Sequence, residues 1–80
     1  MLKIEKILVI SNGEYDIRIE NPEKVLAAMS DPYGCLILHS KFTVLHKVDE
    51  GIASVIFLGG EEVIIKADEF INLLKEVVCE

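Results

Sequence analysis

Three residues of this chain, Cys35, His39 and His46, are of types that bind soft metal ions or form activated thiols. A two-residue turn at Ser40-Lys41 would pair position 35 with position 46 on neighbouring strands, so we expect Cys35 and His46 to face each other. Zinc normally takes three or four protein ligands, and only His39 or Cys79 could complete such a set. No CxxC or HExxH pattern occurs. A zinc or thiol site at Cys35 and His46 is therefore one alternative, and a small core cysteine is the simpler interpretation.

A second group of candidate residues is acidic. If the last four strands form a meander, the turn at Asp49-Glu50 and the segment Asp68-Glu69 fall at the same end of the sheet. Calcium takes six to eight oxygen ligands, so these four carboxylates with turn carbonyls and water could hold one ion weakly. The spacing of an EF-hand is absent, and acidic turns and helix starts are common solvated features. Asp49, Glu50, Asp68 and Glu69 are therefore candidate ligands of an alternative calcium site, and we expect no other cofactor.

Other catalytic or phosphate-binding patterns are absent from the sequence. The pair Gly59-Gly60 precedes Glu61-Glu62, whose charges would repel a phosphate, and neither GxGxxG nor GxxxxGK[ST] occurs. No serine stands in a GxSxG context. We therefore expect no catalytic residues, and an enzyme is the less favoured interpretation.

The first elements that must position these residues form a hairpin and a short helix. An apolar-rich segment over residues 2–10 ends before Asn12-Gly13, a strong signal for a hairpin turn. The returning segment 15–20 alternates, which places Tyr15, Ile17 and Ile19 on one face. Asn21-Pro22-Glu23 offers an N-cap residue, a proline for the first helical position and an acid near the positive end of the helix dipole. A helix of two or three turns is predicted to begin there and to end by Gly34.

The rest of the chain predicts strands followed by a second helix. Turn signals separate apolar segments, which predict strands at Cys35–Leu38, Phe42–Val48, Ile52–Leu58 and Val63–Ile65. Apolar residues then recur at helical spacing from position 69 onward, with Asp68 as the expected N-cap. The order ββα-ββββ-α with short connections predicts one antiparallel sheet of five to six short strands with two helices packed on one face. Residues 1–80 are thus expected to form a single α+β domain.

Composition narrows the classes of function. Ile, Val and Leu make up 28 of 80 residues. A chain of this size buries only about 60 to 65% of the surface that its unfolded form exposes, so some aliphatic surface should stay exposed in a monomer. We therefore expect the protein to bury this surface by self-association. The net charge of −6 argues against nucleic-acid binding, because it repels the phosphate backbone. No signal-peptide pattern or membrane-length apolar run occurs, and the two cysteines are expected to be reduced, so we expect a cytoplasmic protein.

These observations favour a noncatalytic acidic interaction module that associates with itself or with a protein partner. The edges of a small sheet offer a better route for such association than the amphipathic C-terminal helix does, because their backbone donors and acceptors are unpaired. The alternatives are the calcium site at the acidic end of the sheet and the zinc or thiol site at Cys35 and His46.

Overall fold

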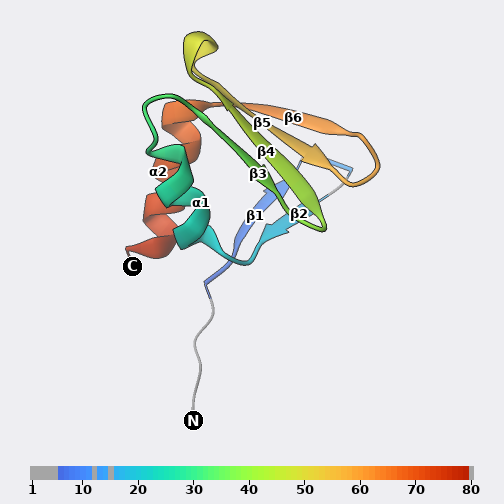
Figure 1. The fold of residues 1–80 in the computed structure, drawn as a ribbon. Coiled ribbons are helices and arrows are strands. Elements are labelled where there is room, and N and C mark those ends of the chain that lie inside the picture. The colour runs from blue at the N-terminus through green and yellow to red at the C-terminus, as the bar shows by residue number, and fades with distance from the viewer. Residues whose placement is uncertain (1–5, 12, 15, 80) are drawn as a thin grey trace.

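The computed structural model describes residues 6–11, 13–14 and 16–79. Its elements follow the predicted order of two strands, a helix, four strands and a helix (Figure 1). Their bounds are β1 Leu8–Ser11, β2 Asp16–Ile19, α1 Pro22–Met29, β3 Cys35–Leu38, β4 Phe42–Lys47, the 3₁₀ turn η1 Val48–Glu50, β5 Ile52–Phe57, β6 Glu62–Lys66 and α2 Ala67–Val78. The α+β class is confirmed.

The last four strands form an antiparallel meander in the order β3-β4-β5-β6. The turn at Ser40-Lys41 is closed by the His39 amide, which donates to the Phe42 carbonyl at 2.9 Å. This turn sets the predicted register, with Cys35 opposite His46. The β4–β5 turn passes through η1 and ends at Gly51, whose φ of 68° lies in the left-handed region that glycine adopts without a steric penalty.

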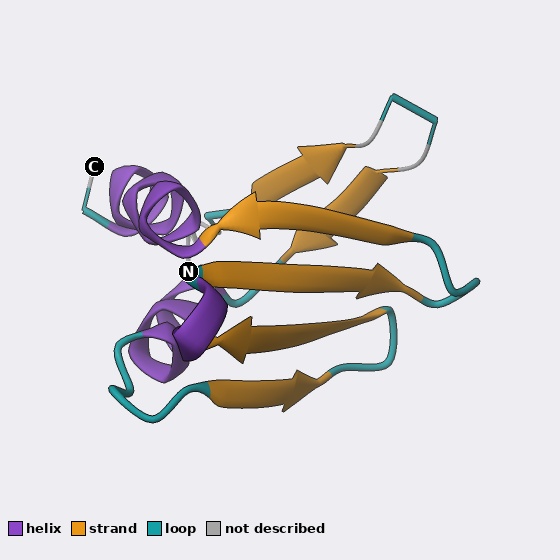
Figure 2. Cartoon of the chain, turned by 90° about the horizontal axis from the view of Figure 1, so that it is seen from above, coloured by secondary structure: helices purple, strands orange, loops and turns teal. Residues whose placement is uncertain are grey.

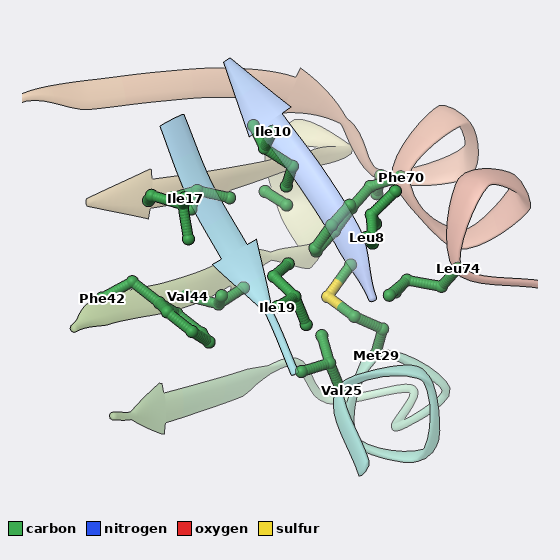
Figure 3. Packing of buried hydrophobic residues seen from close by; sticks show 13 residues of the cluster. Leu8, Ile10, Ile17, Ile19, Val25, Met29, Phe42, Val44, Phe70 and Leu74 are labelled. Carbon is green, nitrogen blue, oxygen red and sulfur yellow. The ribbon is translucent and has the colours of Figure 1, made fainter. Parts of the chain in front are cut away.

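The expectation of one sheet of five to six strands is wrong, because β1 and β2 form a separate two-stranded sheet. Leu8 and Ile10 on β1 and Ile17 and Ile19 on β2 are all buried on one side of this hairpin. Those side chains gain more burial when the hairpin lies over the face of the larger sheet than at its edge. Figures 1 and 3 show that arrangement, with the hairpin crossing one face of the meander. The predicted turn residue Asn12 and the predicted face residue Tyr15 lie outside the described residues.

The two helices begin without side-chain caps. Helix α1 starts with Pro22 at its first position, as predicted, but the Asn21 side chain makes no capping hydrogen bond. The prediction of Asp68 as the N-cap of α2 is wrong, because the helix already begins at Ala67 and Lys66 is the N-cap residue. The Ala67 amide donates to the Gly51 carbonyl at 2.9 Å. A backbone partner thus satisfies a free amide at the helix start, and Asp68 lies in the first turn.

One apolar cluster lies between the meander and the layer formed by the hairpin and helices (Figure 3). Phe70 and Leu74 of α2 and Met29 of α1 are almost fully buried in it. The other buried members are Leu8, Ile10, Ile17, Ile19, Val25, Phe42, Val44, Ala53, Val55 and Ala67. Both helices and the hairpin therefore cover the same face of the four-stranded sheet.

Candidate functional site

The opposite face of the four-stranded sheet, here called the outer face, is also largely apolar. Side chains alternate between the two faces along each strand, and paired residues of neighbouring strands share a face. Since Val44, Val55 and Ile37 belong to the core side, the alternate positions of each strand form the outer face. Its six aliphatic side chains are Leu36, Leu38, Leu45, Ile52, Ile56 and Ile64.

Several of these aliphatic side chains are strongly exposed. Leu36 is 59% exposed, Leu38 76% and Ile64 59%. No described helix or hairpin strand covers them, and Figure 2 shows the four strands from above without a helix or hairpin strand crossing in front. Contiguous apolar patches of this kind mark interaction sites more often than scattered exposed residues do.

The register arranges the outer face in rows across the strands. The central row is Leu36, Leu45, Ser54 and Ile64. Ser54 is only 1% exposed, and its hydroxyl has no hydrogen-bond partner among the described residues. A small, unpartnered residue therefore lies in the middle of the apolar face, flanked by larger aliphatic side chains.

Charged side chains stand only in the two end rows of the outer face. Lys47 and Lys66 belong to the row at one end of the strands, together with Ile52. Glu62 belongs to the row at the other end, beside Ile56. The Lys47 ammonium lies 3.8 Å from the Glu50 carboxylate, whereas Lys66 and Glu62 form no ion pair with another described residue. The apolar face thus has a positive end and a negative end on strand β6.

Sequence reasoning anticipated surplus aliphatic residues but missed the residues of this face. A signal was present, since the Cys35–Leu38 strand is apolar at every position and β5 is nearly so. Such runs are typical of strands covered on both faces. Here the structure provides cover on one face only.

The acidic residues predicted to share one end of the sheet are brought together only in part. Glu50, Asp68 and Glu69 line an open groove beside Lys66 and Asn72. Asp49 lies instead along a separate depression with Tyr33 and His46. Within residues 6–11, 13–14 and 16–79, no three His, Cys, Asp or Glu side chains are grouped so as to hold a metal ion. All four carboxylate residues are exposed, and calcium binding at them stays a prediction.

Cys35 and His46 face each other as predicted, but their surroundings favour a neutral thiol. Burial raises the pKa of the Cys35 thiol, a backbone hydrogen bond at His46 opposes this shift, and the negative charge of Asp31 adds to it. The Cys35 Sγ lies 3.9 Å from the Met29 Sδ. The pKa shift therefore works against a thiolate at neutral pH.

The further ligands considered for a zinc site lie elsewhere. The His39 ring stacks on Phe42 with ring centroids 4.5 Å apart. Cys79 is exposed immediately after α2, and neither Cys79 nor Cys35 is in a disulfide. The structure does not assemble these residues around Cys35 and His46, so it adds no support for this alternative.

Comparisons with protein-family models, curated proteins and solved structures give no significant match for this chain. No helix in the described part of the chain is long and apolar enough to cross a membrane.

Proposed function

We propose that this protein is a noncatalytic interaction module that associates with itself through the outer face of its four-stranded sheet. The observation that carries this proposal is that six aliphatic side chains form rows on the outer face, that no described helix or hairpin strand covers them, and that charged side chains stand only in the end rows. Paired β-sandwich sheets bury such faces against each other about 10 Å apart. The expectation of association through sheet edges remains a second route at the same sheet.

The size of the face indicates reversible association. Four strands and five residues along each strand span roughly 19 by 17 Å. That is the scale of the largest apolar patches on monomers, whereas a stable interface buries about 800 Å² of accessible surface per partner. Full burial of a Leu or Ile side chain contributes about 1.5–3 kcal/mol. We therefore expect a concentration-dependent dimer with a dissociation constant of about 1 μM or weaker.

The proposal is tested with a lysine introduced into the central row. Leu36→Lys places a charge where a second copy would cover it, so the variant should remain monomeric at concentrations where the native protein associates. Val9→Lys is the matched control, because Val9 is 54% exposed on β1 and lies in the other layer. Sedimentation equilibrium over a concentration series measures both. Native protein that stays monomeric throughout, or equal loss of association in the two variants, would reject the proposal.

Calcium binding at the acidic end is the alternative function, favoured by the groove that Glu50, Asp68 and Glu69 share. Exposed carboxylates without a preformed cluster would bind calcium weakly, with a dissociation constant of about 1 mM or higher. A calcium titration followed by amide NMR shifts tests this, with magnesium as the comparison ion. Saturable shifts near Asp49 and Asp68 support the site, and unchanged shifts exclude it.

A further inference from the structure

The charges of β6 are arranged so that two outer faces complement each other. Lys66 and Glu62 lie on the same face of β6, four residues apart. Their backbones are separated by about 13 Å along the strand, and their side chains form no ion pair with each other. A second copy turned end to end would bring each of them opposite its counter-charge.

Given the self-association proposed above, on which this step rests, we propose that the partner is a second copy in one defined arrangement. The two copies pack outer face to outer face about a twofold axis that runs across the strands along the central row. Lys66 of each copy then lies opposite Glu62 of the other. An isologous contact of this kind closes as a dimer.

This axis determines which residues of the two outer faces lie opposite each other. A rotation about the central row keeps each strand opposite itself and reverses its direction. Leu36 and Ile64 then meet their own counterparts, and Ile52 lies opposite Ile56 of the second copy. The small Ser54 falls on the axis, between Leu45 and Ile64 of its own row. Apolar side chains therefore meet apolar side chains in the central row and on β5, whereas Leu38 falls opposite Gly34 and Lys47 falls opposite Thr43 of the second copy.

Sheet twist leaves the charge pairs within reach. Facing sheets cross at about 30°, which displaces facing residues near the edge strand by about 5 Å at a radius of roughly 10 Å. The lysine side chain is long and flexible enough to bridge such a displacement. Of the two lysines on the outer face, Lys47 already lies beside Glu50, whereas Lys66 forms no ion pair with another described residue.

The acidic end of the sheet favours the same axis over its main competitor. An axis along the strands would place each end of the sheet against the same end of the second copy. It would therefore bring together the Asp49-Glu50 turn and the Asp68-Glu69 segment of both copies, and these carboxylates outnumber Lys47 and Lys66 at the same end, so the net interaction is repulsive. The axis across the strands instead keeps the two acidic ends at opposite ends of the dimer.

Charge reversal tests this arrangement. Lys66→Glu and Glu62→Lys each turn two attractive pairs into two repulsive ones, and each variant alone should dimerise about tenfold more weakly than its control. The controls, Lys24→Glu and Glu23→Lys on α1, make the same changes of net charge on exposed residues of the other layer. An equimolar mixture of Lys66→Glu and Glu62→Lys should form a heterodimer about as strong as the native dimer. Sedimentation equilibrium measures all of these.

The outcomes separate this inference from the proposed function. Dimerisation that Leu36→Lys abolishes, but that both β6 reversals leave at the level of their controls, overturns the axis and retains the self-associating face. Complementation in the mixture together with a Leu36→Lys protein that still dimerises would indicate β6 edges paired to each other, and it overturns the face-to-face arrangement. A native protein that is monomeric at every concentration overturns both proposals.

Discussion

Among the described glycines, Gly34 has the most constrained backbone, and the structure shows a steric reason for this. Its φ is +96°, and a Cβ built there would lie 2.7 Å from the His46 carbonyl oxygen. The carbonyl belongs to the neighbouring strand β4, so it is not free to move as the end of a flexible side chain would be. Both the dihedral angle and the close approach therefore require glycine at this position.

We predict that Gly34→Ala lowers the free energy of unfolding by about 2 kcal/mol or more. Gly51→Ala is the matched control, because Gly51 also has a positive φ, of 68°, but a Cβ there would meet nothing within 4 Å. That change should cost only about 1 kcal/mol. Urea denaturation of both variants measures the difference. Equal losses would show that the contact with His46 contributes nothing.

The raised pKa of Cys35 predicts slow thiol chemistry. A thiol pKa above its ordinary value means that the folded protein favours the protonated form. The preference of the folded protein for the protonated thiol contributes to the free energy of unfolding at neutral pH. This contribution is lost as the pH rises through the pKa of Cys35 in the folded state. We expect iodoacetamide to modify exposed Cys79 several-fold faster than Cys35 at pH 7.5, and the reaction of Cys35 to speed up as the pH is raised toward the elevated pKa of its thiol. Mass spectrometry of the Cys79→Ser variant isolates Cys35, and fast modification at pH 7.5 would contradict the assignment.

Pairing of candidate residues could be predicted from the sequence, but their chemical environment could not. Cys35 lies opposite His46 because a two-residue turn leaves one register for its strands. The pKa of the Cys35 thiol depends on burial and on Asp31, and the stacking of His39 depends on the position of Phe42. These depend on tertiary packing that strand periodicity does not describe.

Among the elements, order and approximate bounds could be predicted, since turn residues separate runs of clear periodicity. The predicted strands Phe42–Val48 and Ile52–Leu58 each extend one residue beyond the observed β4 and β5. The error at Asp68 has a physical cause, because the Gly51 carbonyl from a distant turn accepts the hydrogen bond of the Ala67 amide. The placement of the first hairpin was also missed, because alternation identifies a buried side and does not identify what covers it.

The hairpin contributes to the core as a second layer, which a pair of substitutions tests. Ile19 on β2 is fully buried, so Ile19→Ala should lower the free energy of unfolding by about 2–4 kcal/mol. Val9→Ala on β1 should change it by less than about 0.5 kcal/mol, because Val9 points away from the core and is half exposed. Denaturant unfolding followed by circular dichroism provides both values. Similar values for the two variants would mean that the hairpin does not pack on the sheet.

At the scale of the whole molecule, the position of the helices and the hairpin decides which apolar side chains stay exposed and can contact a partner. Both helices and the hairpin lie on one face of the meander, and this leaves Leu36, Leu38 and Ile64 exposed on the other. The composition indicated surplus apolar surface, but the sequence does not show that all the covering elements share one side. The structure therefore identifies one surface for the association that the composition led us to expect.

The effect of salt on association tests the balance between this surface and the charge of the molecule. Each copy carries a net charge of −6, and with sheets about 10 Å apart the centres of two copies lie about 20 Å apart. Treated as point charges in water, the copies repel by about 4 kcal/mol at 10 mM salt and by less than about 1 kcal/mol at 150 mM. The two Lys66–Glu62 pairs contribute only about 0.2–1 kcal/mol each. Added salt weakens both these pairs and the repulsion between the copies. The free energy of association lost at the pairs is smaller than the free energy gained from the weaker repulsion.

We therefore predict that dimerisation strengthens at least about tenfold when NaCl is raised from about 10 to about 150 mM. The Lys66→Glu variant should gain more than the native protein, because its net charge is more negative and its facing charges repel. Sedimentation equilibrium at several salt concentrations measures both dependences. A native dimer that weakens as salt rises would show that ion pairs dominate the association, and the aliphatic outer face would then not be its main source of affinity.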